Sequence, residues 1–238
     1  MMTEPLFRTD AYLKRAPGRV VGLTPEGGIV LDQSLFYATA GGQPGDSGNI
    51  VWDGGEIAIA TAVKGDAGAI VLVPAAPAAL PPVGAAVEQA LDWERRYRHM
   101  RVHTALHLLS VAIPLPVTGG QIGTEKGRLD FDMPEVPADV QAIEEVVNRM
   151  IAQGLPVSED WITDAELEVN PQLVRTMAVK PPMGSGRVRL VLIGPDGALD
   201  RQPCGGTHVK NTGEIGRLTV TKIEKKGKLN RRIRVAFA

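Results

Sequence analysis

The chain has 238 residues, enough for one large domain or two modest ones, and 44% of them are hydrophobic, so a sizeable core can form. The formal net charge of −1 at pH 7 excludes a general attraction to polyanions, and no apolar run is as long as a membrane span. The N-terminus lacks the apolar stretch of a signal peptide and Cys204 is the only cysteine, so we expect a cytoplasmic protein that has no disulfide and binds no membrane.

The first ninety residues predict β-structure. Residues 18–32, 49–63 and 68–74 are short runs rich in Val, Ile and Ala, separated by turns that contain glycine. The proline-rich run at 74–86 is unsuited to a central strand or a helix interior, so we expect a loop there and a strand at 85–92. Residues 1–90 therefore predict a small antiparallel barrel or sandwich.

The pattern changes after Asp92. A strong helix begins at Trp93 and is stopped by Pro114 and Pro116, and helical periodicity returns at 138–154 and at 163–174, where Thr163 and Glu166 form a capping box. Strands are expected at 127–133, 186–194, 216–226 and 230–238, the last two as a hairpin. Residues 91–238 thus predict a second domain, a two-layer α+β domain.

Two pairs of soft metal ligands occur in the chain. His103 and His107 are four residues apart in the first helix and share one face, while Cys204 and His208 are four apart in the stretch CGGTH. A single histidine pair is more often part of a core, but these two pairs use the only cysteine and three of the four histidines. Imidazole and thiolate ligands in a set of four favour Zn²⁺, in either a closed structural site or an open catalytic one.

Thr104 occupies the position at which the metalloprotease motif H-E-x-x-H has its general-base glutamate, so a zinc peptidase is not expected. HTALHLL followed by D-R-x-x-C-G-G-T-H-V-x-x-T-G-E-I-G instead resembles the editing domain of alanyl-tRNA synthetase and its free-standing relatives, the AlaX-type trans-editing proteins. The stretch FYATAGGQPGDSG at 36–48 extends the resemblance over most of the chain. The chain is too short to hold an aminoacylation core as well.

The resemblance implies a zinc-dependent aminoacyl-tRNA deacylase, with His103, His107, Cys204 and His208 as the zinc ligands. Its substrate would be alanine-specific tRNA mischarged with serine chiefly, and with glycine also. Zinc could activate the attacking water, or it could only hold the aminoacyl group, because an aminoacyl ester is already reactive. The residues do not distinguish these two modes.

By the same resemblance, the segment 118–131 lines the amino-acid pocket, and Thr118, Gln121 and Thr124 could recognise a serine hydroxyl. A polar turn between helix and strand is the alternative. The chain departs from the family at Leu106, where threonine is common, and at Gln121, where serine is frequent. Gly41, Gly42 and Gln43 are expected to shape the substrate pocket, the alternative being a glycine turn between strands.

Clustered cations predict contacts with tRNA phosphates, which are salt-dependent and carry little base specificity. The candidate cations are Arg95, Arg96, Arg98 and Arg101 in the first helix, ahead of its histidine pair, and Lys222, Lys225, Lys226, Lys228, Arg231 and Arg232 in the C-terminal hairpin. A solvated strand face is the alternative for the hairpin. Two other functions stay open, a non-catalytic tRNA- or RNA-binding module with a structural zinc and a small-molecule zinc hydrolase. The sequence gives no oligomeric state.

Overall fold

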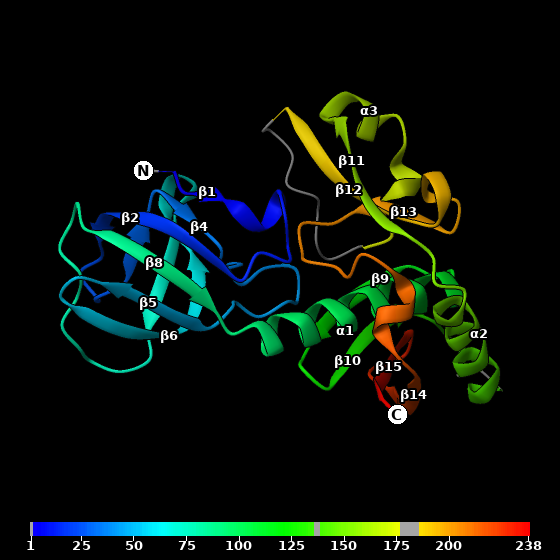
Figure 1. Cartoon of the computed structure of the whole chain (residues 1–238). Coiled ribbons are helices and arrows are strands. Elements are labelled where there is room, and N and C mark those ends of the chain that lie inside the picture. The colour runs from blue at the N-terminus through cyan, green and yellow to red at the C-terminus, as the bar shows by residue number, and fades with distance from the viewer. Residues whose placement is uncertain (1, 136–138, 177–185) are drawn as a thin grey trace. The chain divides into compact units, whose positions relative to one another are not determined.

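The computed structural model describes residues 2–135, 139–176 and 186–238 and has the predicted α+β character. The chain divides into two compact units, Met1–Tyr97 and Arg98–Ala238 (Figure 1). Within the described residues, no helix combines the length and the apolar character that a membrane span requires.

The first unit is a closed barrel of antiparallel strands, so the barrel is confirmed over the sandwich. Its order is β2-β3-β7-β6-β5-β8, and β2 pairs with β8 to close it. The strands are β2 (Arg15–Leu23), β3 (Ile29–Leu31), β5 (Gly48–Trp52), β6 (Gly55–Lys64), β7 (Ile70–Pro74) and β8 (Ala86–Leu91). Two short strands, β1 (Glu4–Pro5) and β4 (Gln33–Ser34), pair in parallel beside it. Residues 75–85 lie outside the strands, as the prolines predict.

The barrel core follows from residue alternation along the strands. In β6, Ile57 and Ile59 are buried while their neighbours are exposed, and Ile29, Ile50 and Leu72 are fully buried. Apolar side chains at every second position fill the interior, and closure leaves no unpaired strand edge in the barrel.

An internal ion pair joins the loop at 36–48 to the start of helix α1 (Trp93–Ala112). Arg96 and Asp46 are each 1% exposed, and Nε of Arg96 donates to both carboxylate oxygens at 3.0 and 2.9 Å. The guanidinium also donates to the carbonyl oxygens of Ala11 and Leu35, and the amide of Tyr37 donates to Asp46. The expectation that Arg96 binds tRNA phosphate is therefore corrected, because its guanidinium is buried and fully engaged.

The second unit contains a four-stranded antiparallel sheet in the order β14-β15-β10-β9. Its strands are β9 (Val117–Ile122), β10 (Lys126–Asp132), β14 (Leu218–Lys225) and β15 (Asn230–Phe237), and the predicted hairpin is confirmed as β14 and β15. Helix α1 packs closely on β10, because a Cβ at Gly127 would lie 2.6 Å from Cγ1 of Val102 and 3.2 Å from Cδ1 of Leu106. Glycine at this position permits the close approach of helix and sheet.

Helix α2 (Val140–Ala152) matches the helix predicted at 138–154, although Ala138 lies outside the described residues. Asp139 caps it by accepting from the amide of Ala142 at 2.8 Å. Asn148 fixes the helix to β14, since its side chain donates to the carbonyl oxygen of Leu218 and accepts from the amide of the same residue.

A second sheet of three antiparallel strands follows in the order β11-β12-β13. It comprises β11 (Val157–Thr163), β12 (Arg187–Ile193) and β13 (Asp200–Pro203), and Ile162 and Leu190 of the sheet form a small core with Leu167. The capping box of Thr163 and Glu166 is confirmed, but the helix predicted at 163–174 is shorter. It is α3 (Asp164–Glu168), and a separate 3-10 turn (Pro171–Leu173) follows because proline disfavours a helical residue before it.

The Arg96–Asp46 pair predicts a large stability effect in the first unit. Asp46→Asn leaves a buried guanidinium without a counter-charge, so we expect a loss of about 3–5 kcal/mol in the free energy of unfolding. Urea unfolding would be followed by fluorescence in a Trp161→Phe background, where Trp52 and Trp93 of the first unit report. The exposed Asp53→Asn is the control, and an equal effect of the two substitutions would contradict the prediction.

Candidate metal centre

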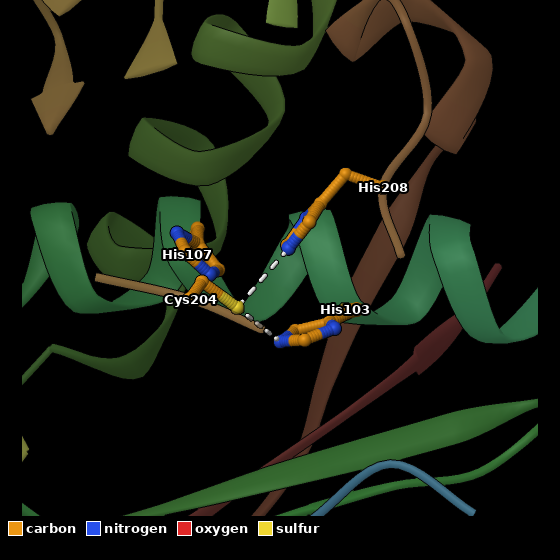
Figure 2. Close-up of side chains that lie close together, drawn as sticks. All are labelled: His103, His107, Cys204 and His208. Carbon is orange, nitrogen blue, oxygen red and sulfur yellow. Dashed lines mark hydrogen bonds between the residues drawn. The ribbon is translucent and has the colours of Figure 1, made fainter. Parts of the chain in front are cut away.

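The two predicted ligand pairs converge on one point. His103 and His107 project from α1, and Cys204 and His208 come from the turn after β13 (Figure 2). One ligand atom from each residue lies within 4.8 Å of all the others. The sulfur of Cys204 is 3.4 Å from Nε2 of His103 and 3.3 Å from Nε2 of His208. The three histidines are 7–8% exposed, and Cys204 is half-buried.

Asp200 orients one imidazole of the cluster. Its Oδ2 lies 3.0 Å from Nδ1 of His107, and a carboxylate only accepts, so Nδ1 carries a hydrogen and Nε2 is the nitrogen that can bind a metal once the imidazole is neutral. The Asp200 side chain is fully buried. It is held in turn by Gln202, whose Nε2 donates to Oδ2 at 2.7 Å, and by Arg175, whose Nη2 is 3.3 Å from Oδ1.

Thr104 orients a second imidazole. Its hydroxyl donates to the carbonyl oxygen of Met100 at 3.0 Å, which leaves its oxygen to accept from the amide of Val209 at 3.3 Å and from Nδ1 of His208 at 3.1 Å. Nε2 of His208 is then free of hydrogen and lies beside the sulfur of Cys204. The residue at the position of the protease glutamate therefore has a positioning role.

The electrostatics of the cluster favour the metal-binding protonation states of Cys204 and His208 but not that of His107. Burial raises the pKa of the Cys204 thiol, but the neighbouring His103 and His208 outweigh it and bring the pKa well below its usual value, which favours thiolate. Burial and His103 lower the pKa of His208 well below its usual value, which keeps it neutral. Burial also lowers the pKa of His107, but its bonds to Asp200 and Cys204 raise it to about 9, so a metal would displace a proton from His107.

The donor set fits a borderline-soft divalent ion. It consists of three imidazoles and one thiolate, and two of the imidazoles have their tautomers set by buried acceptors. Sequence reasoning missed Asp200 as an orienting residue. The signal was its place four positions before Cys204, which puts a carboxylate on the strand that leads into the ligand turn.

The pocket candidates lie in a hairpin. The segment 118–131, expected to line the amino-acid pocket, contains most of β9, a tight turn and most of β10, and Gln121 pairs with Arg128, which donates to its Oε1 at 3.1 Å. Successive side chains of a strand point to opposite faces of the sheet. Gln121 and Arg128 therefore lie on the face opposite to Gly127, the residue that packs against α1. Thr118 is also engaged, because its hydroxyl donates to the carbonyl oxygen of Asp130 and accepts from the Asn230 side chain.

Thr124 differs from these two residues. It is half-buried in the β9–β10 turn, and in the described part of the chain its hydroxyl makes no hydrogen bond. The next residue, Glu125, forms an ion pair with Arg98 of α1. The turn thus lies beside α1 five residues before His103, which is about 7.5 Å along a helix axis.

The GGQ segment forms a tight turn in the first unit. Ala40 and Gln43 exchange backbone hydrogen bonds of 3.1 and 2.9 Å, and Gly41 and Gly42 between them have φ of 56° and 83°. Positive φ at both central positions strongly favours glycine. Gln43 is fully buried, and the two glycines are exposed.

The predicted phosphate-binding cations fall into two groups. Lys225, Lys226 and Lys228 are exposed near the tip of the β14–β15 hairpin. Arg231 is 4% exposed and donates to the carbonyl oxygens of Pro134, Gly227 and Asn230, so its expected contact with tRNA is corrected.

The remaining cations have protein partners. Arg232 forms two hydrogen bonds of 2.8 Å with Asp130, and Lys222 is 3.3 Å from Glu224. Arg101 lies over the ring of Phe237 at 4.0 Å and donates to the carbonyl oxygen of Ile215, while Arg95 donates weakly to that of Ala60 at 3.4 Å. These arginines are less available to a phosphate than Lys225 and Lys228 at the tip. Lys226 shares the Glu224 carboxylate with Lys222, at 3.7 Å.

Two family models match parts of the chain. Residues 188–234 match the second additional domain of threonyl and alanyl tRNA synthetases, and residues 19–95 match the class II (A) tRNA synthetases. The first match includes Cys204 and His208, and the second covers most of the barrel.

Relatives match nearly the whole chain. Alanyl-tRNA editing protein AlaX-M of Methanosarcina acetivorans is 36% identical over 242 residues, and that of Saccharolobus solfataricus is 34% identical over 238, each match covering 98% of both chains. Alanine–tRNA ligase of Pyrobaculum neutrophilum is 34% identical over 94% of this chain, which spans 25% of the ligase. The chain therefore belongs to the AlaX-M family of alanyl-tRNA editing proteins.

Proposed function

We propose that the protein hydrolyses the ester of mischarged alanine tRNA, Ser-tRNA(Ala) chiefly and Gly-tRNA(Ala) also, at a zinc site formed by His103, His107, Cys204 and His208. The observation that carries the proposal is the convergence of these ligands, with Asp200 and Thr104 setting two imidazole tautomers. The names of the relatives specify alanyl-tRNA editing, which supports the same substrate class.

Bound zinc would supply a Lewis acid that either polarises the reacting groups or holds the aminoacyl end in place. The residues of the chain bind the ion and orient its ligands. Asp200 holds His107, and the hydroxyl of Thr104 is already committed to Met100 and His208, so it does not act as a base. An aminoacyl ester is intrinsically reactive, so correct placement supplies much of the rate without a strong general base.

A second candidate function is a non-catalytic RNA-binding module with a structural zinc. It is favoured by the count of four protein ligands, which is usual for structural zinc sites. The partial exposure of Cys204, in contrast to the three buried histidines, favours a site that a substrate can reach. Deacylation of mischarged tRNA by the purified chain separates the two functions.

The zinc assignment predicts joint loss of metal and activity. Cys204→Ala should lower zinc content from about one ion per chain and reduce deacylation of seryl-tRNA(Ala) together, because it removes the only thiolate. Metal analysis and single-turnover deacylation check this. His99→Gln, a substitution of a buried histidine one helical turn before His103, should keep the zinc. A metal-free wild-type chain with full activity would refute the assignment.

The pocket analysis predicts an effect at Thr124. Thr124→Val removes a hydroxyl that can bond serine, so the ratio of serine release to alanine release should fall roughly fivefold, the size of one neutral hydrogen bond. The ratio is measured with seryl-, glycyl- and alanyl-charged alanine tRNA. Gln121→Ala, on the opposite sheet face, should leave it unchanged, and Thr118→Val should lower stability instead. An unchanged ratio in Thr124→Val would assign recognition elsewhere, with Gly41 and Gly42 as the next residues to test.

Docking of tRNA on the hairpin tip predicts a salt-dependent affinity. Replacing Lys225, Lys226 and Lys228 together by alanine should raise the KM for charged tRNA and reduce the log–log salt slope by about 2–3, since each lost phosphate contact removes about 0.7–0.9. Zinc content should stay constant. Replacement of Arg15, Arg19 and Lys64, three exposed cations of the barrel, is the matched control. Equal salt slopes for the two triple variants would mean that the hairpin tip does not bind tRNA.

A further inference from the structure

Arg189 of β12 contacts the turn that presents Cys204 and His208. The Arg189 side chain is 7% exposed. Its Nε and Nη2 donate to the two carboxylate oxygens of Glu159 on β11 at 2.7 and 2.5 Å. Its Nη1 donates to the carbonyl oxygens of Cys204 at 2.7 Å and of Gly206 at 2.9 Å. The backbone oxygen of Arg189 also accepts from the amide of Cys204 at 3.2 Å, so one residue contacts the turn three times.

The turn depends on such external contacts because of its composition. Residues 204–208 form neither helix nor strand, and a Cβ at Gly205 would have no atom within 4 Å. Two adjacent glycines lose more conformational freedom on ordering than other residues do. The planar guanidinium suits the task, since it can pair with a carboxylate through one edge and still donate to two carbonyls through the remaining nitrogen.

We propose that Arg189, itself fixed by Glu159, is a positioning residue that holds the 204–208 turn in its ligand-presenting conformation before metal binds. This inference rests on the proposed function only in taking the cluster as a zinc site. Without Arg189, metal binding would have to order the two glycines as well as place Cys204 and His208. Loss of an outer contact of this kind lowers metal affinity by about 10–100-fold.

The test compares two arginines of one sheet. Arg189→Met removes the donors but keeps an unbranched apolar stem. Arg201→Met is the matched control, because Arg201 of β13 pairs with Asp160 of β11 at 3.2 Å, is 42% exposed and, in the described part of the chain, donates no hydrogen bond to the turn. Zinc affinity of the full-length chain is measured by competition with a chromophoric chelator. We expect a 10–100-fold loss for Arg189→Met and none for Arg201→Met.

Hydrogen exchange of the metal-free proteins supplies the second measurement. In Arg189→Met the amides of residues 204–208 should exchange faster, while those of the barrel stay as in the parent chain. If Arg189→Met does not fold, Arg189→Lys replaces it, because one ammonium cannot reproduce the carboxylate fork and both carbonyl contacts. Parent-like affinity and parent-like exchange in the folded variant would overturn the inference. If the parent chain binds no zinc, the proposed function fails. Hydrogen exchange of residues 204–208 in the metal-free proteins still decides whether Arg189 positions the turn.

Discussion

Three imidazoles and a thiolate cannot be gathered in a largely buried place unless their other polar atoms are also satisfied. That requirement organises much of the second unit. Asp200 satisfies the outer nitrogen of His107 and Thr104 that of His208, and each of them is held by further partners. The orienting groups come from α1 and β13, the same elements that supply or precede the ligands. Each orienting residue thus lies near one ligand pair in the sequence and orients a histidine of the other pair, and the two pairs are 97 residues apart.

The ligands and the barrel could be predicted from sequence because their signals are local. The spacing of four within each pair and the alternation of apolar residues in short strands need no knowledge of what lies elsewhere. The short strands β9, β11 and β13 were missed because they have little regular alternation. In β11, for example, only Ile162 is buried, and the strand is defined by pairing with β12 along its whole length.

The cationic candidates show a different limit of sequence reasoning. Arg96 and Arg231 belong to clusters that look like phosphate sites in the sequence, yet both are buried by partners distant in the chain, Asp46 and Pro134. The face of β10, β14 and β15 also interleaves acids with cations. Asp130 pairs with Arg128 and Arg232, and Glu224 pairs with Arg234, which holds the pKa of the Glu224 carboxyl near 2. Strand register decides which cations remain uncompensated, and register is a tertiary property.

The ion pair of Arg96 and Asp46 has a consequence for how the chain can be divided into fragments. The first residues of α1 belong to the barrel unit, while the same helix carries His103 and His107 further on. A fragment that starts at residue 91 would contain Arg96 without its buried carboxylate, and the complementary barrel would contain Asp46 without its counter-ion. A cut after Tyr97 would keep the pair but begin the other fragment inside a helix, without a cap. Neither cut gives two self-sufficient pieces, so α1 ties the folding of each unit to the continuity of the chain.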